Sequence, residues 1–313
     1  MILGIDTSNY TTSICLIDEN GIVDETRQLI KVKEGQKGIR QSDAFYQHMQ
    51  VLHEWVMNVL PVHSAKIKAI GVSTKPRPVE GSYMPVFNAG NIIASTIQGC
   101  LLCEKYDLSH QEGHLEAATS TSGLTEKEFN FIHLSGGTTE VHHVTYHENR
   151  PQLVLLSETA DISIGQLVDR IGVRAGLAFP CGAEMDKRSI NGPLLKEMPS
   201  FRMAKHFNLS GYENFYSELL NSHKGQEDYV YFNLFCGIES ILRKMILHAV
   251  DQTGIHTILL AGGVAASSTL KMLLQSDKKL KGINLIFSDA KYASDNAFGT
   301  AKLAERLFLG HSL

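Results

Sequence analysis

The chain has 313 residues, 43% of them hydrophobic and 20% charged, which is enough for two globular domains with separate cores. A net charge of -4 gives no general attraction to nucleic acid, so a contact with RNA would need a local basic patch. The five cysteines have no framework spacing and fit a reducing compartment. The apolar run at 1–5 is too short for a signal peptide, and no stretch is long enough to cross a membrane. We therefore expect a cytoplasmic protein without membrane contacts.

The first half of the chain begins with a predicted meander of three strands. Its apolar runs are separated by the polar segment TSNYTT and the turn ENG, and they lie at 2–6, 13–18 and 22–30. Apolar residues at helical spacing predict a long helix at 42–60, with Ser42 or Asp43 as N-cap. A buried strand at 67–74, a proline-rich loop and a helix to about Lys105 follow.

The second half repeats this plan. Apolar runs at 129–144 and 152–159 predict another meander, and strand–helix pairs follow from 257 and from 284. The repetition predicts an α/β fold of two similar lobes with a cleft between them, as in the actin-like and sugar-kinase (ASKHA) fold with its duplicated ribonuclease-H-like lobes. We place the lobes at 1–125 and 126–313, with a helical insertion around 163–255.

Two pairs of glycines follow predicted strands, in LSGGTTE and in LLAGGVAAS. Glycine allows a ligand to approach the backbone and allows positive φ, and the exposed amides can hold phosphate or carboxylate oxygens. A helix starting near Ala265 would add its N-terminal dipole to the second loop. One pair alone can be an ordinary tight turn, but two pairs at the carboxyl ends of strands favour nucleotide binding.

The segment SHQEGHLEAAT places His110 and His114 four residues apart, with Ser109 as a candidate helix N-cap. On a helix their Cβ atoms would lie roughly 6 Å apart on one face, which suits two imidazoles on one metal ion. The chain has 14 histidines, so an accidental pair of surface or packing residues is the simpler interpretation.

Two other metal sites fit the histidine pair less well. A zinc-protease motif needs its glutamate directly after the first histidine, whereas Gln111 stands there and Glu112 lies about 200° around the helix. A zinc finger would add Cys100 and Cys103, but six residues separate Cys103 from His110 where about twelve are usual.

Six motifs in order resemble the tRNA threonylcarbamoyladenosine synthase family, which includes bacterial TsaD and its archaeal and eukaryotic relatives. They cover nearly the whole chain and read GIDTS, HQEGHL, LSGGTTE, GQLVDRIGVRAGLAFPCG, AGGVAASSTLK and SDNAFGTA. The resemblance implies the two-lobed actin-like fold and a metal-dependent transfer of a threonylcarbamoyl group from its adenylate to an adenosine of tRNA. It also implies one divalent ion, iron or zinc. The implied partners are threonylcarbamoyl-adenylate or another adenine nucleotide, tRNA, and other subunits of a tRNA-modification complex.

The resemblance also assigns site residues, although no catalytic residue. It places His110, His114 and Asp295 on the family's metal ligands and makes His133 a candidate fourth ligand. Two imidazoles and a carboxylate suit zinc or iron(II), and an open position could polarise a carbonyl or bind a phosphate. The nucleotide-binding positions that it implies are Leu134, Ser135, Gly136, Gly137, Asp169, Gly182, Gly263 and Ser267.

The chain departs from the family around the acceptor side of the site. Both carboxylates of the opening motif are replaced, by Tyr10 and Thr11, and a glycine-rich loop has become the segment 75–78, KPRP. Thr138 stands where the family has a histidine, and Ser267 where it has an asparagine. Three functions therefore stay open: the family reaction, a related carbamoyl-type transfer or nucleotide hydrolysis by a divergent paralogue, and a non-catalytic scaffold that binds nucleotide and metal.

Overall fold

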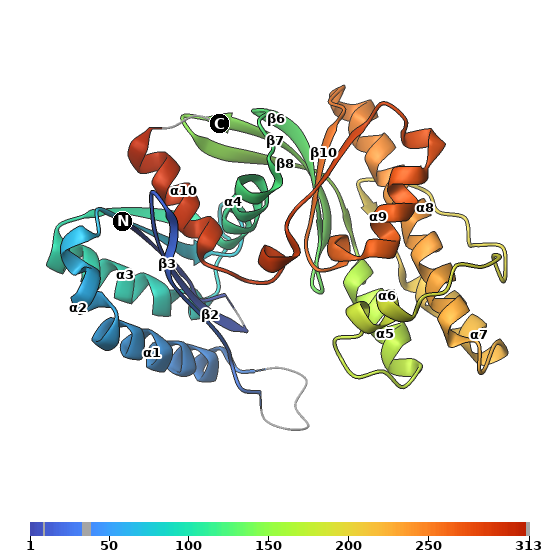
Figure 1. Cartoon of the computed structure of the whole chain (residues 1–313), viewed down its shortest axis with the longest axis horizontal. Coiled ribbons are helices and arrows are strands. Elements are labelled where there is room, and N and C mark those ends of the chain that lie inside the picture. The colour runs from blue at the N-terminus through green and yellow to red at the C-terminus, as the bar shows by residue number, and fades with distance from the viewer. Residues whose placement is uncertain (9, 33–38, 311–313) are drawn as a thin grey trace. The chain divides into compact units, whose positions relative to one another are not determined.

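A computed structural model describes residues 1–8, 10–32 and 39–310, which form two compact units (Figure 1). The first unit comprises Met1–Thr125, Tyr146–Pro151 and Ser294–Leu313. The second comprises Glu126–Thr145 and Gln152–Ala293. Among the described residues, no helix is both long and apolar enough to span a membrane.

The first unit is built on a five-stranded sheet in the order β3-β2-β1-β4-β5. The predicted meander is confirmed, and its strands pair antiparallel, whereas β1 pairs with β4 and β4 with β5 in parallel. The strands are β1 (Ile2–Asp6), β2 (Thr11–Asp18), β3 (Gly21–Leu29), β4 (Ala69–Lys75) and β5 (Glu104–Ser109). The helices are α1 (Gln41–Asn58), α2 (Leu60–His63), α3 (Asn88–Leu101), α4 (His110–Ser122) and α10 (Phe298–Leu309). The helix predicted to about Lys105 is wrong at its end, because α3 stops at Leu101 and β5 follows.

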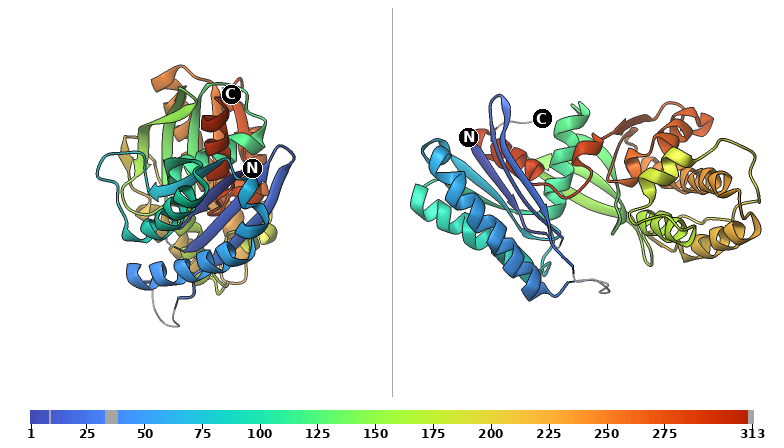
Figure 2. Two further views of the ribbon diagram at one scale, coloured as in Figure 1. Left: turned by 90° about the vertical axis from the view of Figure 1, so that its left-hand side faces the viewer. Right: turned by 60° about the horizontal axis from the view of Figure 1, so that its bottom comes forward.

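Helices cover both faces of this sheet (Figure 2). A Cβ on Gly4 would lie 2.3 Å from the Ala297 carbonyl oxygen, at the start of α10. A Cβ on Gly90 in α3 would lie 3.1 Å from the side chain of Ile5. Because successive residues of a strand face opposite sides, α10 packs on one face of β1 and α3 on the other.

The second unit has a six-stranded sheet in the order β11-β10-β6-β7-β8-β9. Five of its strands, β8-β7-β6-β10-β11, repeat the order of the first sheet, as the predicted duplication requires. The strands are β6 (Glu128–Leu134), β7 (Thr139–His147), β8 (Arg150–Thr159), β9 (His206–Phe207), β10 (Thr257–Ala261) and β11 (Asn284–Phe287). The helices are α5 (Ile164–Arg174), α6 (Gly182–Arg188), α7 (Ser210–Ser222), α8 (Glu227–Thr253) and α9 (Ser268–Ser276).

The helices α5 to α8 stand between β8 and β10, where the first unit has α1 and α2. They form the main core of the second unit with alternate side chains of β6 and β10, such as Ile132 and Leu260. The order of the predicted elements along the chain led us to expect a second lobe over 126–313, but residues 294–310 lie in the first unit. The physical reason is the close packing of α10 on β1, where Gly4 leaves room for the helix backbone.

Candidate metal centre

The helix that carries the two histidines begins at a capping box, as the sequence indicated for Ser109. The Ser109 hydroxyl accepts a hydrogen bond from the Glu112 amide at 3.2 Å, and Glu112 Oε2 accepts from the Ser109 amide at 2.7 Å. Glu112 is buried and also pairs with Arg150, at 2.8 Å. This carboxylate therefore holds the start of α4 and does not serve as the base of a protease site.

Three side chains of the first unit bring ligand atoms of the right kind together. The Nε2 atoms of His110 and His114 lie 3.0 Å apart, and Asp295 Oδ1 lies 3.5 Å from the first and 3.3 Å from the second. A tetrahedral zinc ion with bonds of about 2.0–2.1 Å separates its ligand atoms by about 3.3 Å. The three side chains therefore stand at the spacing that one ion requires, and the donor set suits zinc or iron(II).

Close helix packing brings Asp295 to the histidines. A Cβ on Gly299 in α10 would lie 1.9 Å from the Gly113 carbonyl oxygen in α4, and a Cβ on Gly113 would lie 2.9 Å from Thr300 Oγ1. The glycine between the two histidines therefore serves helix contact.

A buried carboxylate, Asp6 at the end of β1, lies beside His110. Asp6 Oδ2 lies 2.8 Å from His110 Nδ1 and accepts a hydrogen bond from Ser73 Oγ at 2.6 Å, and Oδ1 accepts from the Ser8 amide at 2.9 Å. Burial raises the pKa of Asp6, but His110 and these hydrogen bonds outweigh it and hold the pKa well below its usual range. Burial lowers the pKa of His110, but Asp6 and Asp295 outweigh it and raise that pKa to about 9.

The other candidate ligands belong to other elements of the chain. His133 belongs to β6 in the second unit, where its Nδ1 lies 3.2 Å from Thr138 Oγ1 and its ring stacks on Phe131. Its role as a fourth ligand stays a prediction. Cys100 is exposed on α3, and the cluster of metal-ligand side chains found in the described part of the chain includes neither Cys100 nor Cys103, so the zinc finger is not formed.

The first glycine loop of the second unit connects β6 and β7. The Ser135 hydroxyl accepts hydrogen bonds from the amides of Gly137, at 3.2 Å, and Thr138, at 3.0 Å, so these amides organise the loop itself. Cβ atoms built on Gly136 and Gly137 would meet no atom within 4 Å, which leaves room for a ligand. Leu134 differs from the other predicted contacts of this loop, because its side chain is fully buried in the core.

The second glycine loop follows β10. Of the paired glycines, Gly262 has a positive φ of 102° and contacts the Leu134 backbone, whereas Gly263 has open space around it. Both loops therefore lie at the carboxyl ends of their strands, β6 and β10, as predicted, and Gly262 of the second loop contacts the last residue of β6. The helix expected from Ala265 begins at Ser268, with Ser267 as its N-cap.

The amino end of α9 already holds an anion from its own chain. Asp186 of α6 accepts hydrogen bonds from Ser267 Oγ at 2.6 Å, from the Ser268 amide at 2.8 Å and from the Thr269 amide at 3.0 Å. Its carboxylate accepts hydrogen bonds from the backbone amides at the amino end of α9, the position that was expected to attract a phosphate.

The remaining predicted nucleotide contacts lie nearby in the same unit. Asp169 accepts a hydrogen bond from the Cys181 amide at 2.8 Å, and Gly182 is the first residue of α6. Burial raises the pKa of Asp169. Asp186 follows Gly182 by four residues in the same short helix. Helix α6 therefore connects the predicted contact at Gly182 with the amino end of α9, where Asp186 binds.

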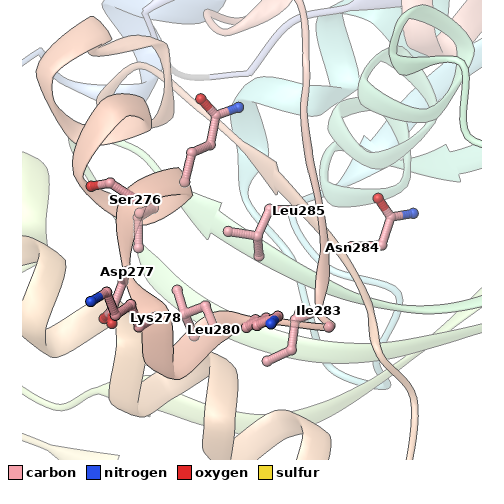
Figure 3. Close-up of a pocket in the computed structure, with 11 residues that line it drawn as sticks. Ser276, Asp277, Lys278, Leu280, Ile283, Asn284 and Leu285 are labelled. Atoms are coloured by element: carbon pink, nitrogen blue, oxygen red, sulfur yellow. The ribbon is translucent and has the colours of Figure 1, made fainter.

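Sequence reasoning missed Asp6 and Asp186, since no motif spacing connects them to His110 or Ser267. A surface pocket on the second unit is lined by residues 274–278 and 280–285, including Ser276, Asp277 and Asn284 (Figure 3). None of the predicted site residues lines this pocket, so it has no part in the candidate site.

Comparison with solved structures places the chain in the actin-like, sugar-kinase class of folds. Full-length HypF in its phosphate- and nucleotide-bound form superposes with a TM-score of 0.58 at 10% identity, over 98% of this chain and 55% of HypF. A glucokinase of the ROK family from Streptomyces griseus gives a TM-score of 0.55 at 11% identity, over 97% and 99% of the two chains. These likenesses confirm the predicted fold.

Sequence comparison gives the family. The family model described as tRNA N6-adenosine threonylcarbamoyltransferase, TsaD, matches residues 22–302, so the chain belongs to this family. A relative of that name from Halalkalibacterium halodurans is 27% identical over 334 residues, covering 100% of this chain and 94% of the relative. A "probable bifunctional tRNA threonylcarbamoyladenosine biosynthesis protein" from Thermoplasma acidophilum is 27% identical over 307 residues, covering 97% of this chain. The chain spans 55% of that archaeal relative.

Proposed function

We propose that the protein transfers a threonylcarbamoyl group from its adenylate to an adenosine of tRNA, at a site that contains one zinc or iron(II) ion. The observation that carries the proposal is the convergence of His110, His114 and Asp295 at metal-ligand spacing in a chain of this family. When bound, the ion would supply a Lewis acid that polarises a carbonyl or binds a phosphate oxygen.

The second unit would bind the nucleotide part of the donor. Gly137 and Gly263 leave space beside the backbone at the ends of two parallel strands, where ligands bind in open α/β sheets. Asp169, whose carboxylate accepts one hydrogen bond from the Cys181 amide, offers oxygens that can accept further hydrogen bonds from ribose hydroxyls. This arrangement favours a nucleoside with its phosphate directed away from α9.

A direct assay tests the transfer. Protein supplied with zinc or iron(II), threonylcarbamoyl-adenylate and bulk tRNA should form threonylcarbamoyladenosine, detected by mass spectrometry of the digested nucleosides. His114→Ala should lose the bound ion and the product, because removing one ligand of three weakens metal binding strongly. Modification by a metal-free His114→Ala protein at the wild-type rate would refute the metal centre.

A second candidate function is a related carbamoyl-type transfer to another acceptor. Tyr10, which is 40% exposed, and Thr11, which is buried, put a phenol and an aliphatic hydroxyl in place of two carboxylates of the family. Lys75 and Arg77 flank Pro76, whose carbonyl accepts a hydrogen bond from Gln111 in the first turn of α4.

This hydrogen bond brings the segment that carries the two cations to the start of α4, and guanidinium and ammonium groups favour an anionic partner such as a phosphate or carboxylate. Acceptor profiling separates the two functions: the donor should be consumed with tRNA in the first case, and only with a different acceptor in the second.

A further inference from the structure

We infer that Asp6 is a positioning residue of the metal centre, which keeps the proton of His110 on Nδ1 so that the Nε2 lone pair is directed toward His114 and Asp295. The inference rests on the proposed metal centre and gives it a residue, Asp6, that lies in the motif GIDTS and was not assigned to the metal.

The hydrogen-bond geometry fixes the direction of the contact. Asp6 is fully buried, and its Oδ1 and Oδ2 already accept hydrogen bonds from the Ser8 amide and the Ser73 hydroxyl. An ionised carboxylate only accepts hydrogen bonds, so His110 must donate through Nδ1 across the 2.8 Å contact. An imidazole that carries its proton on Nδ1 presents Nε2 as the metal ligand.

The carboxylate is also held rigidly. Asp6 ends the central strand β1 and pairs with Ser13 of β2, while Ser73 lies on the neighbouring strand β4. Ser73 Oγ in turn lies 3.5 Å from Thr300 Oγ1 in α10. One network therefore connects the sheet to α4, which carries the two histidines, and to α10, which follows Asp295, and it fixes the orientation of the His110 ring.

Partners of this kind outside the ligand shell typically change metal affinity by about 10–100-fold when they are removed. Asp6→Asn keeps the size and the planar group but can present an amide N–H to His110 Nδ1. The ring would then carry its proton on Nε2, where the ion should bind.

The test measures zinc affinity with zinc alone, by competition with a chromophoric chelator. Asp6→Asn should raise the zinc dissociation constant by about 10–100-fold. Ser73→Ala is the matched control, because it removes one hydrogen bond to the same carboxylate but leaves the contact with His110. It should weaken zinc binding less than Asp6→Asn does. Equal zinc affinity of Asp6→Asn and wild type would overturn the inference.

A second measurement needs no substitution and holds even if Asp6→Asn fails to fold. In zinc-loaded wild-type protein with ¹⁵N-labelled histidine, the ring of His110 should show a coordinated Nε2 and a protonated Nδ1. Coordination through Nδ1 would overturn the role of Asp6. If the wild-type protein binds no zinc, the metal centre fails first, so the two failures are distinguishable.

Discussion

Gly299 and Gly113 meet at backbone contact, so that a Cβ built on Gly299 would lie 1.9 Å from the carbonyl oxygen of Gly113. The two helices α4 and α10 approach this closely because neither position has a side chain. Asp295 precedes α10 by three residues, and both histidines lie on α4. The contact therefore sets the spacing of the three metal ligands.

Gly299→Ala should disturb this contact. The added methyl group would force the helix backbones apart, and overpacking of this kind costs about 1–3 kcal/mol. We expect a lower free energy of unfolding in urea and weaker zinc binding.

Gly99→Ala is the control for this substitution. Gly99 lies within α3, and a Cβ built there would meet no atom within 4 Å. Because alanine favours an exposed helix position over glycine, Gly99→Ala should raise the free energy of unfolding by about 0.5–1 kcal/mol and leave zinc binding unchanged. Equal effects of the two substitutions on zinc binding would show that the glycine contact does not position the ligands.

Gly137→Val tests the nucleotide loop of the second unit. The position has open space around it, so the variant should fold with a wild-type melting temperature. Its side chain would occupy the space proposed for the ligand, and calorimetry should find no binding of threonylcarbamoyl-adenylate. Normal binding would exclude this loop from the site. Gly262→Val is the contrasting variant, which should unfold more easily because its positive φ and its contact with Leu134 exclude a side chain.

His48 should make the protein less stable in acid. It is fully buried on α1, with Nδ1 2.7 Å from Thr12 Oγ1. Burial lowers its pKa from 6.5 to about 4, although Asp6 opposes the shift. Between these values the unfolded chain binds a proton that the folded chain does not, so this contribution to stability is complete above pH 6.5 and is lost as the pH falls toward 4.

His48→Gln keeps a polar partner for Thr12 but does not titrate. Urea unfolding at about pH 7 and about pH 5 should show a smaller loss of stability in the variant than in the wild type. An identical loss in both proteins would assign the acid sensitivity to other groups.

Glu239 should have the opposite pH dependence. Burial and the neighbouring Asp277 raise its pKa from 4.5 to about 7, in spite of the attraction of Arg243. The folded chain therefore binds the extra proton between these values, and its stability decreases as the pH rises from 4.5 through about 7. Glu239→Gln should remove this decrease in urea unfolding, and persistence of the full decrease would contradict the assignment.

Local patterns in the sequence predicted the meanders, the duplication and the N-cap of α4, because these depend on residues that are near each other in the chain. The strand β5 was missed because only its last two residues, Leu108 and Ser109, are buried, so the polar start resembled a helix end. Asp295 was found through the family resemblance and not through spacing.

Contacts between distant segments could not be predicted in this way. Asp6 and His110 are 104 positions apart, and Asp186 and Ser267 are 81 apart. Each pair depends on strand order and helix packing that no single segment encodes. Leu134 was assigned to the ligand because it belongs to the loop motif, but as the last residue of β6 its side chain points into the core.

The most direct test of the proposed transferase is the modification of tRNA in cells depleted of their own threonylcarbamoyladenosine synthase. Such cells should recover threonylcarbamoyladenosine, measured by nucleoside mass spectrometry, when they express the wild-type chain, and should not recover it with His114→Ala. Absence of the modified nucleoside with a wild-type chain that is folded and binds zinc and adenylate would contradict the proposed acceptor and favour the second candidate function.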